Sequence, residues 1–356
     1  MDFGTVVFAR PNSCAAEAKL AEECGFSHAW VADSHMMAGD VYMCLALMAA
    51  ATSRIRLGTG VAVPGGRIAP LTASCMATLN QMAPGRVSMG IGTGNSARRA
   101  MGFPPCSLAE LRDHVQVVRE LLRGRQVNYR EGAAERAVRF FHQDMDFMNT
   151  RAEVPIYVAA NAPKAMALAG EIGDGFLTSR TNTPQGWREA WQYVSRGARR
   201  AGKDPAELYS ALITATCLLR PGEGVDAPRV KAAAGAWATV ALHSLYETAK
   251  DPAAAPEPLR PLFAEYKAFT DRRVAASDTY HLDLHDGHCL YVQPEEERFV
   301  TPELIRAATM TATPEALIER LHGLEDAGVK QVAFIPPTNG YAEFVTQFSQ
   351  QVIARF

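Results

Sequence analysis

Short apolar runs alternate with helix-patterned segments along most of the chain. In the first half, the predicted strands span 3–8, 29–33, 55–63 and 87–92, and the predicted helices span 13–25, 40–52, 71–82 and 108–122. In the second half, strands are predicted at 154–160, 175–178, 208–219 and 331–335, with helices at 163–172, 184–201 and 341–355. This alternation is typical of βαβ units that build a parallel sheet.

Eight predicted strands favour a closed (β/α)₈ barrel of the TIM type, with a doubly wound open sheet as the alternative. The alternation stops over 220–310, which opens with Arg220-Pro221-Gly222 and has helical patterns at 230–249 and 262–274. We therefore expect a single domain over 1–356. Residues 220–310 form an insertion before the last strand, and we expect that insertion to lie over the barrel mouth.

Charge and composition exclude several classes of partner. The 356 residues carry a net charge of −2, which provides no basic field for nucleic acid or an anionic membrane. No apolar run approaches the roughly 20 residues that cross a bilayer, and the N-terminal MDFGTVVFAR does not resemble a signal peptide. Seven dispersed cysteines without a CxxC pair do not form a disulfide framework. We expect a cytoplasmic protein that acts on a small molecule.

The clearest candidate for proton transfer is Asp33-Ser34-His35, which follows the second predicted strand. In barrels of this kind the loops after the strands form the active site, and a carboxylate beside an imidazole can move protons near neutral pH. The alternative interpretation is that Asp33 caps the next segment and His35 is solvated.

Two neighbouring strands each carry glycine along one face. Gly58 and Gly60 share a face of the third strand, and Ser88, Gly90 and Gly92 share a face of the fourth. Glycine weakens a strand unless another group must approach closely. The pattern predicts either a flat cofactor ring against the inner barrel wall or large side chains from other strands in the same space.

Phosphate recognition has two candidate segments. Gly90-Ile91-Gly92-Thr93-Gly94 comes fourth in the strand series with GxGxG spacing, which does not match a Rossmann fingerprint. Ala159-Ala160-Asn161-Ala162-Pro163 instead leads from a strand into a helix with proline in its first turn. Free N–H groups at such a helix start bind phosphate.

Several runs, in this order, resemble the luciferase-like flavin- and deazaflavin-dependent oxidoreductases. They are Ala29-Trp30-Val31-Ala32-Asp33, Arg54–Val61, Thr72–Leu79, Gly85–Gly92 and Val154–Ala160. Within that superfamily the chain looks most like the methylenetetrahydromethanopterin reductases, which use the deazaflavin coenzyme F-420 (F420). The likeness extends from the N-terminus to about residue 180 and returns over 311–356. It does not extend over 220–310, the region that should shape substrate binding.

The resemblance implies a TIM-type barrel, a homodimer and hydride transfer through F420 or FMN to a small organic substrate. It also implies a non-prolyl cis peptide at Gly60–Val61, behind the cofactor ring. Asp33 and His35 would be the catalytic residues beside the reactive edge. The cofactor-binding residues would be Gly60, Val61, Gly92, Thr93, Gly94, Ala160, Asn161, Ala162, Gly175, Thr178 and Ser179, the last six near the ribityl phosphate.

Other functions remain open. FMN would allow oxygen activation, as in a monooxygenase, and either cofactor could be supplied by a separate flavin or deazaflavin reductase. A metal-dependent barrel hydrolase could use His281, His285 and His288, although the turn signal Asp286-Gly287 argues against one continuous ligand-bearing helix. We expect no metal, and a substrate-facing or structural role for these histidines. The third alternative is a flavin-binding subunit without catalysis.

Overall fold

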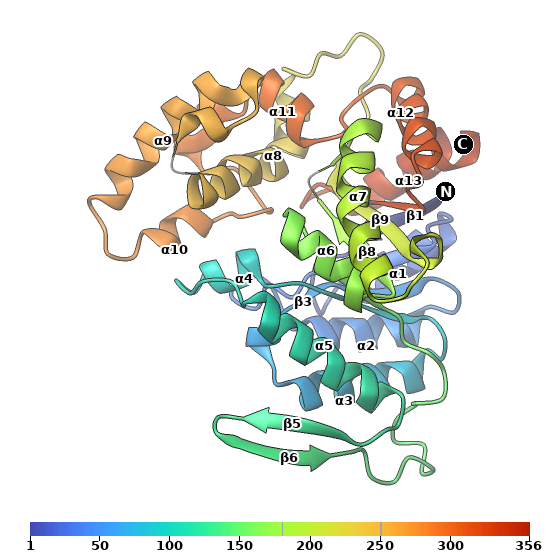
Figure 1. Ribbon diagram of the computed structural model, residues 1–356. Coiled ribbons are helices and arrows are strands. Elements are labelled where there is room, and N and C mark those ends of the chain that lie inside the picture. Colours follow the sequence, from blue (N-terminus) through green and yellow to red (C-terminus); the bar gives the residue numbers. More distant parts are fainter. Residues whose placement is uncertain (180, 250) are drawn as a thin grey trace. The chain divides into compact units, whose positions relative to one another are not determined.

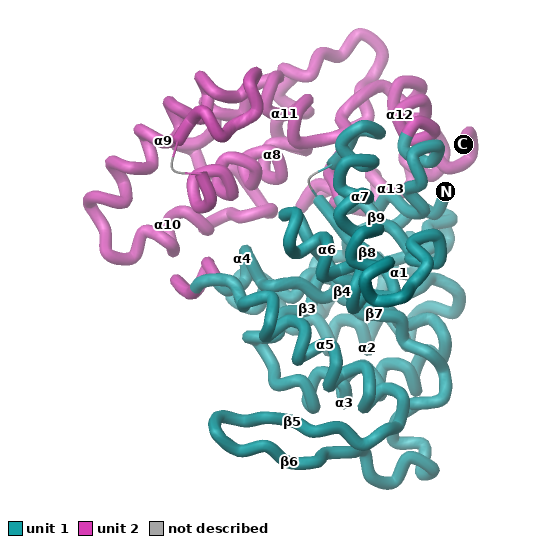
Figure 2. Tube along the Cα trace, in the orientation of Figure 1, with its two compact units in different colours: residues 1–98, 104–213, 324–333 teal, residues 99–103, 214–323, 334–356 magenta. Residues whose placement is uncertain are grey.

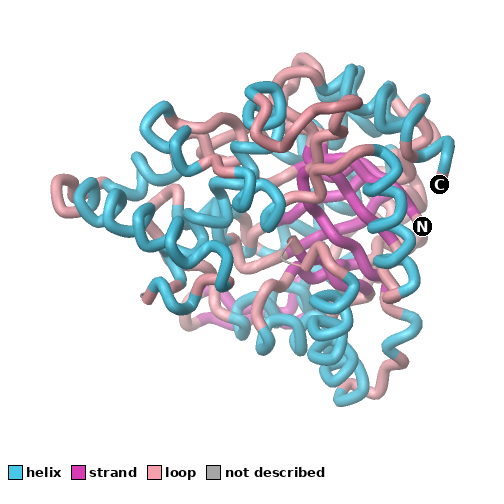
Figure 3. The backbone as a smooth tube through the Cα atoms, turned by 90° about the horizontal axis from the view of Figure 1, so that it is seen from above, coloured by secondary structure: helices cyan, strands magenta, loops and turns pink. Residues whose placement is uncertain are grey.

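In the computed structural model, which describes residues 1–179, 181–249 and 251–356, eight strands close into a barrel (Figure 1). The strands follow the order β1-β10-β9-β8-β7-β4-β3-β2, and the neighbours pair in parallel. Their bounds are β1 Asp2–Val6, β2 His28–Val31, β3 Arg56–Ala62, β4 Val87–Ile91, β7 Ile156–Ala159, β8 Gly175–Thr178, β9 Tyr209–Ala215 and β10 Gln331–Ile335. Figure 3 shows these strands in magenta, running side by side. The predicted TIM-type barrel is confirmed.

Six helices begin within two residues of the predicted positions. They are α1 Cys14–Glu23, α2 Val41–Ala51, α3 Ala69–Met82, α5 Leu108–Leu122, α6 Pro163–Ile172 and α7 Pro184–Arg200, whereas the short helix α4 Asn95–Arg99 was not predicted. Helix α5 shows the local reason: Ser107 Oγ accepts from the Glu110 N–H (3.1 Å), and Glu110 Oε2 accepts from the Ser107 N–H (2.7 Å). This capping box fixes the start of the helix.

An antiparallel hairpin, β5 (Val127–Glu131) with β6 (Ala134–Val138), was not predicted. Most of its residues are exposed on both faces. A strand pair without a buried face lacks the alternation of apolar and polar residues by which strands are recognised in a sequence.

The described chain divides into two compact units (Figure 2). Unit 1 comprises residues 1–98, 104–213 and 324–333, and unit 2 comprises 99–103, 214–323 and 334–356. Helices α8 Pro228–Thr248, α9 Arg260–Val274, α10 Tyr280–His285, α11 Pro302–Ala308 and α12 Pro314–Asp326 lie between β9 and β10, and α13 Tyr341–Gln351 follows β10. The predicted insertion before the last strand is confirmed. Its position over the mouth, and the single-domain organisation, stay predictions.

Unit 2 has an apolar core of its own. Buried side chains of α8, α9 and α11 meet there, among them Leu242, Phe263, Tyr266 and Leu304. None of the described helices is long and apolar enough to cross a bilayer.

Aromatic side chains fill the interior of the barrel. The Trp30 ring is fully buried, and its Nε1 donates to Gln331 Oε1 (2.9 Å). Tyr157 stacks on Tyr209 with ring centroids 5.2 Å apart. A Cβ atom at Gly58 would lie 2.5 Å from Trp30 Cζ3, and one at Gly60 would lie 2.9 Å from Trp30 Cβ. The glycine face of β3 therefore accommodates the indole, which is the second of the two interpretations proposed for it.

Candidate functional site

Asp33 and His35 lie together just after the end of β2. The Asp33 side chain is only 8% exposed, and its Oδ1 lies 3.8 Å from His35 Nδ1, while the His35 side chain is 25% exposed. The backbone N–H of Val63 also donates to the Asp33 carboxyl group. A Cβ atom at Gly66 would lie 3.5 Å from His35 Cε1, so the 3₁₀ segment Pro64–Gly66 borders this pair.

The alternative interpretation of this pair is wrong in its first half. Helix α2 is capped by Asp40, whose Oδ1 accepts from the N–H groups of Tyr42 (2.9 Å) and Met43 (3.0 Å). Asp33 is therefore not the cap, and His35 is only partly solvent-accessible.

Burial sets the electrostatics of the Asp33 carboxyl group. Burial raises the pKa of Asp33, and the charges of His35 and Arg67, which lower it, do not fully offset that effect. Arg67 pairs with Asp40 and places its guanidinium 4.8 Å from the centre of the Tyr42 ring. The pKa of Tyr42 is raised by burial and by the nearby charge of Asp33. Asp33 is thus a carboxyl group that holds a proton more readily than an exposed aspartate.

Asp40, Tyr42 and Arg67 were not predicted as part of this site. Asp40 could have been found as the residue before a helical run. Arg67 follows Pro64-Gly65-Gly66, but nothing in the sequence indicates that it would reach across to Asp40.

The ends of β3 and β4 bring together most of the predicted ring-binding residues. The Gly60–Val61 peptide is cis, as predicted, and the β3–β4 register shifts between Thr59 and Ala62. Gly60 and Val61 are half-buried, whereas Thr59 and Ala62 are buried. A Cβ atom at Gly92 would lie 3.2 Å from Val61 Cγ2, which places Gly92 directly beside the cis peptide segment.

Thr93 and Gly94, the next predicted cofactor-binding residues, follow Gly92 at the end of β4. Thr93 is half-buried, and its carbonyl oxygen accepts from the Cys106 N–H (2.9 Å). Gly94 has φ +79°, a left-handed conformation that favours glycine, and a Cβ atom there would lie 2.3 Å from Val63 Cγ1. Gly94 is therefore required by the turn itself.

The ends of β7 and β8 are joined through Asn161. Its Oδ1 accepts from Thr178 Oγ1 (2.8 Å) and from the Ser179 N–H (3.2 Å), and its Nδ2 donates to Ser179 Oγ (3.2 Å). Ala160 is held by its N–H, which donates to the Leu177 carbonyl (3.0 Å). Ala162 is the N-cap of α6 and provides no side-chain cap to the helix. The backbone N–H groups at this helix start stay candidates for binding phosphate.

Gly175 is not part of this group. It is the first residue of β8, whereas Thr178 is the last, and a Cβ atom at Gly175 would lie 2.5 Å from Tyr157 Cδ1. The structure places Gly175 at the opposite end of the strand, where it makes room for a tyrosine of the barrel interior.

The three histidines of 280–288 lie in unit 2. His281 and His285 belong to α10, which ends at His285, and Gly287 has φ +76°, so the predicted break in the helix is confirmed. The buried His285 bonds Glu247 through Nε2 (3.0 Å). His288 is also buried, and its Nδ1 lies 3.5 Å from Nδ1 of His243. Among the described residues, no group of three or more His, Cys, Asp or Glu side chains is arranged to hold a metal ion.

His243 and Glu296, which complete this buried cluster, were not singled out in the sequence. His243 Nε2 lies 3.2 Å from Glu296 Oε2, and Tyr266 donates from its hydroxyl to Glu296 Oε1 (2.8 Å). Burial lowers the pKa of His288 well below its ordinary value, and the neighbouring imidazoles of His243 and His285 lower it further. These residues are far apart in the chain, so no local motif could reveal the cluster.

The sequence profile of the luciferase-like monooxygenases matches residues 3–331. The chain belongs to this family. It is 30% identical to a 5,10-methylenetetrahydromethanopterin reductase from Archaeoglobus fulgidus, with 88% of this chain and 86% of that protein aligned. A reductase of the same name from Methanolobus tindarius is 37% identical, but the alignment covers 54% of this chain and only 57% of that protein. An F420-dependent glucose-6-phosphate dehydrogenase from Nakamurella multipartita is 25% identical over 97% of this chain and 92% of that one.

Two solved structures share the fold. The coenzyme F420-dependent tetrahydromethanopterin reductase from Methanopyrus kandleri superposes with a TM-score of 0.74 at 23% identity, covering 100% of this chain and 99% of that one. The oxygenating constituent of 3,6-diketocamphane monooxygenase from Pseudomonas putida, solved with FMN, gives 0.64 at 14% identity, over 100% of this chain and 99% of that one. Both cofactors expected from the sequence, F420 and FMN, occur among these proteins.

Proposed function

We propose that this chain is a deazaflavin-dependent oxidoreductase that binds F420 at the C-terminal ends of its barrel strands and acts on an organic substrate. The observation that carries the proposal is the pairing of the buried Asp33 with the partly exposed His35 directly after β2. In TIM-type barrels the strand ends on this side hold the reacting groups. Bound F420 supplies a hydride acceptor or donor, and the protein must then move a proton.

Names of the relatives favour F420 over FMN. The dehydrogenase relative that aligns over 97% of this chain is named as F420-dependent. The reductase from Methanopyrus kandleri is also named as coenzyme F420-dependent. The structural neighbour with FMN is only 14% identical. A deazaflavin reacts poorly with oxygen, so this choice favours reduction or oxidation of an organic substrate over monooxygenation.

The residues at the strand ends fit a flat cofactor. Gly60, Val61, Gly92 and Thr93 form a surface of small, uncharged residues, and Gly60, Val61 and Thr93 are half-buried. Glycine at position 92 leaves the surface flat, because any Cβ there would stand within 3.2 Å of Val61. Asn161 and the first turn of α6 would hold the phosphate through backbone N–H groups.

Asp33 and His35 would divide the proton transfer. Asp33, with its raised pKa, retains a proton readily and fixes the imidazole from 3.8 Å. His35 is the more exposed of the two and would exchange the proton with the substrate. Asp33 acts mainly by orienting His35.

Cofactor titration tests the proposal. The purified protein is titrated with F420 and separately with FMN, and we expect saturable binding that is tighter for F420. Gly92→Val should fill the ring surface and weaken F420 binding by more than tenfold, or about 1.4 kcal/mol. Thermal denaturation must show that this variant remains folded. Binding of FMN alone would redirect the function to oxygen chemistry, and binding of neither cofactor would refute the proposal.

A further inference from the structure

Residues of unit 2 line a half-open cavity of about 740 Å³. Its walls come from α8, from residues 215–220 after β9, from 289–292, and from 335–347, which begin at the end of β10. All of these segments belong to unit 2. Two of them directly continue barrel strands, and in this class of barrel such segments carry the substrate-binding residues.

One part of the lining is apolar and large. Ala236 and Trp237 of α8, Val292, Val300 and Phe344 contribute to it. The Trp237 indole N–H donates to the Ala308 carbonyl (3.2 Å), which holds the ring in place. Cavities of about 300–1,000 Å³ with such walls bind whole organic molecules rather than single small groups. The Trp237 ring and the neighbouring apolar side chains favour a ligand with an aromatic or alicyclic body.

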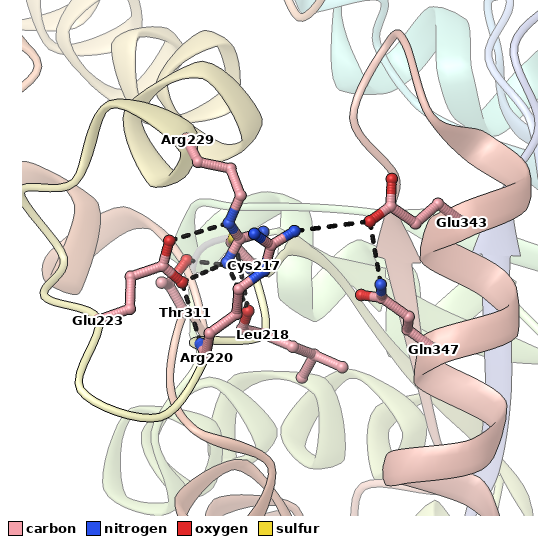
Figure 4. Close-up of polar contacts among 8 residues, drawn as sticks. All are labelled: Cys217, Leu218, Arg220, Glu223, Arg229, Thr311, Glu343 and Gln347. Atoms are coloured by element: carbon pink, nitrogen blue, oxygen red, sulfur yellow. Dashed lines mark hydrogen bonds and ion pairs between the residues drawn. The ribbon is translucent and has the colours of Figure 1, made fainter.

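Charged residues also line the cavity (Figure 4). The charge of Arg229 is balanced by Glu223, because the Arg229 Nε donates to Glu223 Oε1 (2.9 Å). The Arg229 Nη2 donates to the Leu218 carbonyl (2.9 Å). Arg220 is held only loosely: its Nη2 lies 3.9 Å from Oε1 of Glu343. The same Glu343 oxygen accepts from Gln347 Nε2 (3.0 Å).

Lys231 is the cation that we expect to bind an anionic group of the ligand. It lies on α8, lines the cavity and is half-buried. In the part of the chain that the structure describes, no carboxylate forms an ion pair with it. Glu297 lines the same cavity but is exposed, so its charge is already solvated. A half-buried ammonium group without a carboxylate partner favours an anionic group on the ligand.

We infer that this cavity binds a bulky organic anion, with an aromatic or alicyclic body against Trp237 and a carboxylate, sulfonate or phosphate at Lys231. Binding to this cavity does not rest on the proposed function, whereas the identity of the ligand as the organic substrate of that reaction does.

Two fluorescent probes with the same ring system test the inference. The probe 8-anilinonaphthalene-1-sulfonate is an aromatic anion, and N-phenyl-1-naphthylamine lacks the sulfonate. We expect one saturable sulfonate site in the wild-type protein. Lys231→Gln should weaken binding of the sulfonate about tenfold and binding of the neutral amine less than twofold. The matched control is Lys19→Gln, which changes an exposed lysine of α1. It should not alter the binding of either probe.

Filling the cavity separates this site from other apolar surfaces. Ala236→Trp should abolish saturable binding of both probes, and Ala233→Phe provides a second filling variant should the first fail to fold. Probe binding that persists in the folded filling variants, or an equal response of both probes to Lys231→Gln, would overturn the inference. Wild-type protein is titrated with F420 in parallel. If the wild-type protein binds the sulfonate probe but not F420, the proposed function alone is refuted. If it binds F420 but shows no saturable sulfonate site, the cavity inference alone is refuted.

Discussion

At the scale of single residues, the account depends on a carboxyl group and an imidazole held 3.8 Å apart. His35→Ala should lower turnover roughly 10²–10⁴-fold, because the proton donor is lost, while leaving F420 affinity nearly unchanged. Steady-state kinetics with a substrate that the protein accepts, together with F420 titration, measure both effects. The exposed His142 offers a control, and His142→Ala should keep full turnover. If His35→Ala retains wild-type turnover, His35 has no part in the chemistry.

Ionisation of the buried Asp33 lowers the free energy of unfolding, so the stability of the protein depends on pH. Because folding raises its pKa through burial, the folded state favours the protonated form. Stability is therefore lost as pH rises from the unfolded pKa through the folded pKa. Asp33→Asn keeps a neutral group of the same shape, so it should raise the melting temperature near pH 7. That gain should disappear below about pH 3.9, where the wild-type carboxyl is neutral in both states.

Thermal denaturation of both proteins across pH measures this difference. A constant gain at every pH would mean that ionisation of Asp33 is not the cause. A loss of stability near pH 7 would mean that Asp33 is held as a stable carboxylate, which contradicts the proposed environment.

Sequence patterns located the reacting residues but not what surrounds them. Asp33 and His35 could be placed because they follow a strand, and strand ends of a barrel converge. Whether Gly58 and Gly60 make room for a cofactor ring or for a side chain could not be predicted. The sequence does not show that Trp30 points into the barrel at their level. Arg67 and Asp40 meet across 27 residues of chain, and no spacing rule reveals such a pair.

At the scale of elements, α2 and α3 stand out because neither contains a charged residue. Met43 (71% exposed) and Leu47 (43%) project from α2, and Leu71 (46%) projects from α3. A helix that is apolar on all sides is usually buried, and large exposed apolar patches mark interfaces. We propose that this surface joins two copies of the chain, in line with the dimer that the resemblance implies.

Light scattering after size exclusion tests this proposal. The wild-type protein should be a dimer, and the double change Met43→Asp with Leu71→Asp should convert it to a folded monomer, because two carboxylates on each copy would be desolvated. Ala16→Asp on the exposed side of α1 is the matched control and should leave the dimer intact. A monomeric wild type, or a double variant that remains dimeric, would contradict the proposal.

Most elements of unit 1 could be predicted because each has one buried face. The apolar runs of the barrel strands and the caps at Asp40 and Ser107 are local signals. Hairpin β5–β6 escaped prediction because its residues are mostly exposed on both sides. Helix α10 could be predicted only in part. Asp286-Gly287 indicated its end, but the hydrogen-bond partner of the buried His285 is Glu247, which lies 38 residues away.

At the scale of the whole molecule, sequence reasoning predicted the barrel and the insertion before β10, but not the cavity of unit 2. The cavity combines residues from α8, from the continuation of β9 and from the continuation of β10. Its lining is therefore contributed by segments more than 100 residues apart. No motif in any one segment carries that information.

The central claim is that F420 lies at the ends of β3 and β4 beside Asp33 and His35. A crystal structure of the protein with F420 bound tests it most directly. The account predicts that the deazaflavin ring contacts Gly60, Val61 and Gly92 at about 4 Å, with its reactive edge toward His35. A ring bound elsewhere, or bound at this surface with its reactive edge away from Asp33 and His35, would contradict the account.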